Sequence, residues 1–472
     1  MLFNSLTFII FFGGVLLLHL LPLPWTLKKL NLLIASYLFY AAWNPPFVIL
    51  LWISTLVDWF AARGIAAAAG RRKHAWLGLS LLANFGLLGS FKYGGFLLEN
   101  FTAALQLMGV DYHPAAPDIV LPVGISFYTF QTLSYTLDVY KGNMKPWRSP
   151  LDFALYVTFF PQLVAGPIVR AVDFLPQCLA PRRASAAQFS WGASLLILGL
   201  FEKTVIADAL FAPIADKVYE APVLVSARDA WVGTLAFSGQ IFCDFAGYST
   251  CAIGVALCLG FMLQDNFHFP YAAIGFSDFW RRWHISLSTW LRDYLYISLG
   301  GNRSGKLRTY VNLIATMLLG GLWHGAAWTF VAWGALHGAL LALERLLREH
   351  VHAPRCFASL PCRFGLALLT YACVCITWIF FRARSFSDAW TILRGMAGAG
   401  GHEDHLVTPL ELALVCGLTC GILALHFTLR DKSVEEAANW LPWYVRSALL
   451  AGMLIAMITM GGDNRAFIYF QF

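Results

Sequence analysis

Residues 311–343 read VNLIATMLLGGLWHGAAWTFVAWGALHGALLAL, a run of 33 residues without one formal charge. About 20 apolar residues are enough to cross the hydrocarbon core of a bilayer. A helix over the whole run would be about 50 Å long at about 1.5 Å per residue, which is too long for one perpendicular span. The run therefore predicts a broken membrane segment. Gly320 and Gly321 offer a kink, while Gly325 and Gly334 permit close helix packing.

The rest of the chain has the same apolar character. Of its 472 residues, 33 are Lys or Arg and 26 are Asp or Glu, and 59% are hydrophobic against 12% charged. An ordinary soluble domain has about a quarter of its residues charged. This composition excludes a water-soluble enzyme, a disordered chain, a collagen-like repeat and a coiled coil. It predicts an all-α polytopic integral membrane protein with 11 to 13 transmembrane or re-entrant helices, in a single domain over residues 1–472. Further apolar runs lie at 2–22, 30–43, 46–61, 75–91, 119–137, 151–168, 189–207, 229–261, 362–382, 409–427 and 444–460.

The basic residues between the first apolar runs predict the orientation. Residues 2–22 lack a cationic start and a small-residue cleavage site, so we expect a retained first span rather than a signal peptide. Lys28 and Lys29 follow this span, and Arg63, Arg71, Arg72 and Lys73 follow the third. Because cytoplasmic loops are enriched in Lys and Arg, we expect both loops in the cytoplasm and the N-terminus outside. The net charge of +7 reflects the same bias. It forms no continuous basic face, so no nucleic-acid partner is predicted.

Several chemistries have no sequence support. The chain has no GxSxG elbow, P-loop, HExxH motif or dinucleotide-binding turn. Most of its ten cysteines lie in apolar runs without metal-ligand spacing, so neither a metal site nor a disulfide is expected. His402–His405 (HEDH) is interpreted as a surface segment. Four acids in apolar context could form a proton path or pair with Arg and Lys, and the second interpretation is favoured. These acids are Asp58, Asp138, Asp208 and Asp244.

The longest stretch outside the apolar runs is 262–310, with six basic and three acidic residues. It mixes tryptophans and tyrosines with arginines, which is typical of helices that lie in a membrane interface. Two interpretations stay open at this point. The segment is either a structural element on the membrane surface or a basic mouth for an anionic substrate.

His324 stands 14 residues into the uncharged run, at a depth where an ionisable side chain is costly. Such a residue is by default a candidate functional group. The alternative is a neutral histidine hydrogen-bonded between helices. His337 lies 13 residues further on, which turns an ideal helix by about 220° and places it on a different face. We therefore expect no metal-binding pair, and a structural role for His337.

Several strings together resemble one family, the membrane-bound O-acyltransferases (MBOAT). The resemblance is strongest to the bacterial branch that acetylates alginate, and it covers most of the chain in the expected order. The strings around RRWHISLSTWLRDY and LWHGA are the most specific. The matching pieces are LPVGISFYTFQTLSYTLDVY (121–140), FFPQLVAGPI (159–168), DFAGYS (244–249), FWRRWHISLSTWLRDYLYISLGGNR (279–303), GGLWHGAAWTFVAWGALHG (320–338), WIFFRA (378–383) and FIYFQF (467–472).

This resemblance implies a catalytic pair, His324 in the WHG element and His284 in RWHISLS. It also implies an MBOAT fold with interfacial cytoplasmic helices and acetyl-CoA as the donor, with no permanently bound cofactor. Arg281, Arg282, Trp283 and Arg292 would then bind the donor. Thr250 and Cys251 stand where an acid would be expected in this branch, so the acceptor stays open.

The C-terminal tail, residues 463–472, resembles the terminal aromatic motif of a small partner in teichoic acid D-alanylation. Tyr469 would then be an acyl relay, although an aromatic interfacial belt explains the same residues. The resemblance implies a multi-pass protein of the bacterial inner membrane. It would O-acetylate an extracellular polysaccharide such as alginate together with a periplasmic SGNH-type acetyltransferase or another polymer-modifying partner. The alternatives are an MBOAT that acylates a lipid or peptidoglycan, and a membrane transporter, although the paired broken repeats of a transporter are missing.

Overall fold

The structure is a computed structural model that describes residues 1, 3–115, 119–222, 225–350, 359–399, 405–460 and 465–468. Within these ranges every regular element is a helix, as the sequence predicts. Contacts divide the chain into two compact units. Unit 1 comprises Met1–Ala193 and Ala252–Gln264, and unit 2 comprises Ser194–Cys251 and Asp265–Phe472. The single domain over residues 1–472 stays a prediction.

Unit 1 is built from helices at the start of the chain. They are α1 (Leu6–Leu20), α2 (Trp25–Ala41), α3 (Val48–Ala67), α4 (Gly70–Leu88), α5 (Gly94–Leu107), α6 (Ile125–Lys141), α7 (Pro150–Thr158), α8 (Phe160–Leu163) and α9 (Ala171–Phe174). Between α2 and α3, Pro45 and Pro46 begin a short 3₁₀ segment that leads into α3. The run 151–168 is not one span. It forms two short buried helices, α7 and α8, with Phe159 between them.

Unit 2 contains the second half of the chain. Two helices, α10 (Ala186–Phe201) and α12 (Ala227–Cys258), have residues in both units. The others are η4 (Glu202–Phe211), α11 (Ala212–Glu220), η6 (Pro270–Ala272), α13 (Phe276–Arg282), α14 (Ile285–Trp290), η7 (Leu291–Tyr296), α15 (Lys306–His324), α16 (Trp328–His350), α17 (Leu360–Arg382), α18 (Phe386–Met396), α19 (Pro409–Thr428), α20 (Val434–Asn439) and α21 (Trp443–Thr459).

Six helical segments within the described ranges are long and apolar enough to cross a membrane. They are Pro45–Ala67, Gly70–Leu107, Ala227–Cys258, Trp328–His350, Leu360–Arg382 and Pro409–Thr428. Two shorter apolar helices, Leu6–Leu20 and Trp443–Thr459, add to them. These helices confirm a polytopic membrane protein. The predicted 11 to 13 helices included broken pieces, and α7 and α8 are examples of such pieces.

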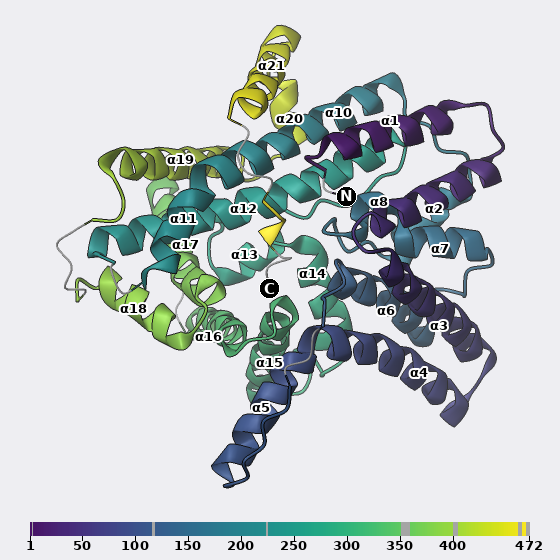
Figure 1. The fold of residues 1–472 in the computed structure, drawn as a ribbon, viewed down its shortest axis with the longest axis horizontal. Coiled ribbons are helices and arrows are strands. Elements are labelled where there is room, and N and C mark those ends of the chain that lie inside the picture. The colour runs from purple at the N-terminus through teal and green to yellow at the C-terminus, as the bar shows by residue number, and fades with distance from the viewer. Residues whose placement is uncertain are drawn as a thin grey trace. The chain divides into compact units, whose positions relative to one another are not determined.

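The uncharged run 311–343 forms two helices that lie side by side, α15 and α16 (Figure 1). A Cβ atom on Gly321 would lie 2.2 Å from the carbonyl oxygen of Phe330, and one on Gly334 would lie 2.3 Å from that of Met317. Only glycine allows the two backbones to approach this closely. The predicted close packing at Gly334 is therefore confirmed. The predicted kink at Gly320 and Gly321 stays a prediction, because α15 continues as a helix through both residues to His324, and the break in the run falls after them.

The segment 262–310 forms η6, then α13, then α14 with η7 following it directly, and ends in the first residues of α15. Several of its aromatic rings pack inside unit 2. Trp283, Trp290 and Tyr294 have exposed fractions of 0%, 6% and 7%. These three rings are therefore packed within the protein.

Candidate active site

His324 is the last residue of α15, and the residue after it explains why the helix stops there. Gly325 leaves the helical conformation with φ −154° and ψ 149°. A Cβ atom on Gly325 would lie 2.1 Å from the ring of Phe330, so any other residue at this position would displace that ring. The chain then reverses into α16, which begins at Trp328. His324 therefore lies at a helix end, beside the turn between two closely packed helices.

Aromatic rings surround the His324 imidazole. Its ring centroid lies 5.0 Å from Trp323, 5.0 Å from Trp333 on α16 and 5.3 Å from Phe381 on α17. All three contacts are edge-on, and His324 is 2% exposed. Edge-to-face packing of this kind holds an aromatic ring in one orientation. The imidazole is thus positioned in an apolar environment.

His284 lies next to His324 in this environment. The two ring centroids are 6.3 Å apart and the ring planes make an angle of 60°. His284 precedes α14 and has φ 43° and ψ 55°, a left-handed conformation that is uncommon outside glycine. Non-glycine residues in this conformation cluster at functional sites, where surrounding contacts hold them. The structure therefore brings together the two histidines that the sequence singled out, from segments 40 residues apart.

Burial controls the ionisation of His284. The side chain is fully buried, and Phe245 on α12 packs edge-on against it with ring centroids 4.6 Å apart. Burial lowers the pKa of His284 from 6.5 to about 3, because an apolar environment disfavours the charged form. The imidazole is therefore neutral at pH 7. One of its nitrogens carries a proton and the other carries a lone pair.

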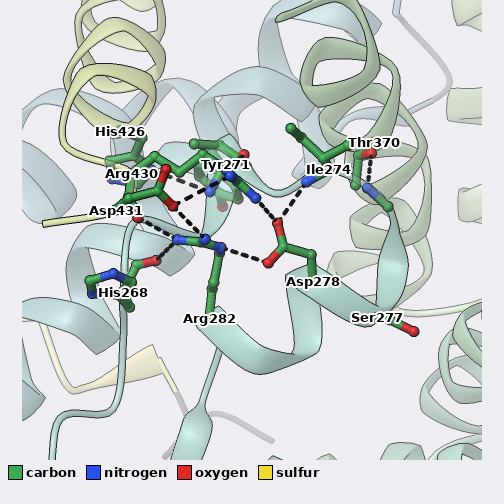
Figure 2. A network of polar contacts seen from close by, with 12 residues as sticks. His268, Tyr271, Ile274, Ser277, Asp278, Arg282, Thr370, His426, Arg430 and Asp431 are labelled. Carbon is green, nitrogen blue, oxygen red and sulfur yellow. Dashed lines mark hydrogen bonds and ion pairs between the residues drawn. The ribbon is translucent and has the colours of Figure 1, made fainter. Parts of the chain in front are cut away.

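A network of charged residues holds the helix before His284 (Figure 2). Arg282 at the end of α13 donates to Asp278 at 2.9 Å and to the backbone oxygens of Arg430 at 2.6 Å and His268 at 3.3 Å. Arg430 pairs with the same Asp278, and Asp431 accepts from both arginines at 3.4 Å. The network ties α13 to the chain after α19. It fixes the turn that carries His284, two residues beyond Arg282.

The predicted donor-binding residues fall into two groups. Arg281 is exposed, and the Arg292 side chain is 61% exposed with a hydrogen bond to Asp293. Arg282 is engaged by the network in Figure 2. Trp283 stacks on Phe279 within the core. Arg281 and Arg292 are therefore accessible, whereas Arg282 and Trp283 are buried among other residues, and donor binding by these four residues stays a prediction.

His337 has the structural role that the sequence predicts. Its Nε2 lies 2.9 Å from the hydroxyl of Thr377 on α17, and its ring packs 4.7 Å from Trp333. Among the described residues no group of three or more His, Cys, Asp or Glu side chains could hold a metal ion. His402, Glu403 and Asp404 lie outside the described residues.

The buried acids have different partners. Lys203 on η4 pairs with Asp208 at 2.8 Å and with Asp244 on α12, which confirms the predicted pairing for these two acids. Asp58 differs, because its carboxylate accepts hydrogen bonds from Ser80 and from Asn84 in unit 1. These partners on α4 are neutral, so pairing with a basic residue was the wrong prediction for Asp58.

The described part of the C-terminal tail docks onto α12. The backbone N–H of Ile468 donates to Asp244 at 2.9 Å. Phe467 is fully buried and packs against Phe245 and Tyr248, with ring centroids 5.5 Å and 5.0 Å apart. Phe245 therefore contacts both Phe467 and His284. Tyr469, the predicted relay, lies outside the described residues.

Sequence reasoning did not identify Asn266 as part of this site. Its side-chain oxygen lies 3.1 Å from Nδ1 of His284, and its backbone oxygen accepts from Ile285. Asn266 is one polar residue in the loop QDNFHFP, where no periodicity marks a side chain that turns inward. The one available signal was the proximity in sequence to the RWHISLS motif.

Comparison with known proteins identifies the family. The model of the membrane-bound O-acyltransferase family matches residues 147–376. The chain is 42% identical over 431 residues to the probable alginate O-acetylase AlgI of Azotobacter vinelandii, covering 91% of this chain and 84% of that one. It is 35% identical over 490 residues to the peptidoglycan O-acetyltransferase of Helicobacter pylori, covering 94% and 91%. It is 28% identical over 290 residues to the teichoic acid D-alanyltransferase of Bacillus subtilis, covering 58% and 72%. The chain therefore belongs to the membrane-bound O-acyltransferase family and is an O-acyltransferase, which removes the transporter alternative.

Proposed function

We propose that this enzyme transfers an acetyl group from cytoplasmic acetyl-CoA, across the bacterial inner membrane, for O-acetylation of an extracellular polysaccharide such as alginate. The observation that carries the proposal is the meeting of His284 and His324 in a buried aromatic environment. The name of the Azotobacter relative, 42% identical over 91% of this chain, supports alginate as the polymer class.

In the proposed reaction His324 is the general base. Its neutral imidazole takes the proton from an acceptor hydroxyl while the hydroxyl oxygen attacks the thioester carbonyl. The new C–O bond forms, the C–S bond breaks, and the imidazolium returns its proton to the leaving thiolate. A hydroxyl is a weak nucleophile at neutral pH, so the base and the positioning of both reactants carry most of the acceleration. His284 orients a reactant or stabilises the developing oxyanion.

The donor would approach past the exposed arginines. Arg281 and Arg292 are accessible, and they can attract the phosphates of acetyl-CoA. Arg282 would act indirectly, because the network that engages it fixes the turn before His284. No permanently bound cofactor is needed in this scheme.

The decisive experiment compares wild type with His324→Ala in a host that lacks its own copy of the gene. The O-acetyl content of the secreted polymer would be measured at matched protein levels. We expect a loss of at least about 100-fold, as is typical when a general base is removed. Unchanged acetylation at a normal protein level would refute the catalytic assignment.

His337→Gln is a matched control for the loss of a buried imidazole. His337 lies on α16 and is hydrogen-bonded to Thr377. We expect this variant to lower the amount of folded protein while each folded molecule keeps its activity. If His324→Ala and His337→Gln lost the same activity per folded molecule, His324 would matter for packing rather than for chemistry.

A second part of the proposal concerns the tail. We propose that Tyr469 accepts the acetyl group first and passes it to an extracytoplasmic transferase of the SGNH type. Support comes from the two residues before it, since Phe467 and Ile468 are buried and Phe467 contacts the same Phe245 that contacts His284. A Tyr469→Phe variant should lose polymer acetylation while the protein stays folded. Normal acetylation in this variant would end the relay proposal and leave the role of His324 untouched.

Peptidoglycan is the second candidate acceptor. The Helicobacter relative named for this activity aligns over 94% of this chain. Acetate released by mild base from purified peptidoglycan and from exopolysaccharide of the same cells would distinguish the two acceptors. Loss of acetate from peptidoglycan alone in His324→Ala would favour this candidate over the first.

A further inference from the structure

Asn266 makes four contacts with the turn that carries His284. Its backbone oxygen accepts from the N–H of Ile285 at 2.9 Å. Its side-chain oxygen Oδ1 lies 3.2 Å from the backbone nitrogen of Ser286, 2.9 Å from the Ser286 hydroxyl and 3.1 Å from Nδ1 of His284. Asn266, His284 and Ser286 are all buried. The Asn266 carboxamide therefore contacts both His284 and Ser286, the two residues that flank Ile285 in the turn.

The contacts also settle which carboxamide atom faces His284. A backbone N–H can only donate, so the atom that contacts the Ser286 N–H must be the oxygen. The contact at the nitrogen end of the carboxamide is consistent with this assignment, because Nδ2 donates to the hydroxyl of Ser249 on α12 at 3.1 Å. An oxygen has no proton to give, so Nδ1 of His284 must donate to it. In a neutral imidazole the lone pair is then on Nε2.

We propose that Asn266 is a positioning residue that fixes His284 in the tautomer protonated on Nδ1, so that Nε2 acts as a hydrogen-bond acceptor in the reaction. The proposal rests on the proposed function, in which His284 belongs to the site. It also decides between the two tasks considered for His284. An acceptor nitrogen can orient a reactant that carries O–H or N–H, such as the acceptor hydroxyl or an amide of the acyl donor. It cannot donate to an oxyanion, so that task must fall to another group.

The surroundings support a neutral His284. Phe245 and Trp323 pack against it and do not ionise, whereas His324 on α15 faces it and can titrate. The residues that contact its Nδ1, Asn266 and Ser286, are neutral as well. A negative charge placed at position 266 would therefore act on His284 at close range.

The test uses two substitutions of similar size. In Asn266→Asp the carboxylate keeps an acceptor for the Nδ1–H and both Ser286 contacts, so the turn is preserved. The new charge should raise the pKa of His284, so the nitrogen-15 titration of this ring should move upward by at least about one pH unit. In Asn266→Leu the acceptor is lost, and the Nε2-protonated tautomer of His284 should appear. Nitrogen-15 spectra of histidine-labelled protein, assigned with His284→Asn, report the tautomer directly.

Ser249→Ala is the control, because the Ser249 hydroxyl contacts the nitrogen of the Asn266 carboxamide and not its oxygen. We expect the tautomer and the titration of His284 to be unchanged in this variant. A wild-type His284 protonated on Nε2, or an unshifted titration of His284 in folded Asn266→Asp, would overturn the inference. The spectra do not depend on activity. If His324→Ala stays active while the tautomer is as expected, the proposed function fails and the positioning by Asn266 stands.

Discussion

At the scale of single residues, His284 couples protein stability to pH. Burial lowers the pKa of His284 from 6.5 to about 3, so between these values the unfolded chain binds a proton that the folded chain does not. The stabilisation is complete above pH 6.5 and is lost as the pH falls toward 3. At pH 5 the loss should be about 2 kcal/mol, since each pKa unit corresponds to about 1.4 kcal/mol.

This prediction can be checked by unfolding wild type and His284→Asn in detergent at pH 7 and pH 5. Other buried histidines contribute to both proteins, so the difference between the two pH dependences isolates His284. Between pH 7 and pH 5, we expect His284→Asn to lose less stability than wild type. An equal loss of stability in both proteins would mean that His284 is charged or accessible in the folded enzyme.

The site residues differ in how far the sequence could identify them. His324 could be recognised because an ionisable group inside a 33-residue uncharged run is costly, whereas His284 emerged from a family resemblance. The ion-pair network around Arg282 could not be predicted, because composition does not reveal partners that lie far away in the chain. Arg430 and Asp431 are almost 150 residues away in the chain. Asn266 was missed for the same reason, since its role depends on a contact formed by a loop.

At the scale of helices, the close approach of α15 and α16 depends on glycine. In Gly321→Ala the new Cβ would lie 2.2 Å from the carbonyl oxygen of Phe330, so the helices must separate. We expect a destabilisation of about 1–3 kcal/mol and a lower activity, because His324 lies three residues further along α15. Thermal unfolding in detergent measures the first effect and an acetyl-transfer assay the second. Gly365→Ala on α17 is the control, since no atom lies within 4 Å of its new Cβ. Equal stability of the two variants would contradict this role for Gly321.

The charged network before His284 offers a matched pair of substitutions. Asp278 and Asp431 contact the same two arginines, Arg282 and Arg430, but their side chains are 17% and 65% exposed. Ion pairs near water contribute little, whereas losing one partner of a buried pair leaves a charge without compensation. Asp278→Asn should therefore cost about 3 kcal/mol and Asp431→Asn less than about 1 kcal/mol, measured by thermal unfolding. If the two variants lost the same stability, burial would not govern this network.

The helix break after His324 shows what the sequence could and could not predict at this scale. Length alone required a break within residues 311–343, because the run is too long for one span. The position of the break depends on tertiary contacts. Gly321 is used for packing inside α15, and the turn falls at Gly325 because the ring of Phe330 leaves no room for a side chain there.

At the scale of the whole molecule, the orientation in the membrane is the main untested prediction. The basic residues Arg71, Arg72 and Lys73 lie at the start of α4, directly after the span Pro45–Ala67. Lys29 gives weaker support for this orientation, because it is buried and pairs with Asp152. A fluorescent protein fused after residue 73 should fluoresce, since such reporters fold in the cytoplasm, whereas alkaline phosphatase at the same site should be inactive. The opposite pattern would reverse the orientation and the side from which the donor enters.

The left-handed backbone at His284 has a practical consequence for engineering. Glycine adopts this conformation without strain, whereas alanine does not. His284→Gly should therefore fold better than His284→Ala and should leave a vacancy of the size of one imidazole next to His324. Free imidazole or a small substituted azole could then restore part of the turnover. Such a variant would be an enzyme whose activity is set by a diffusible compound.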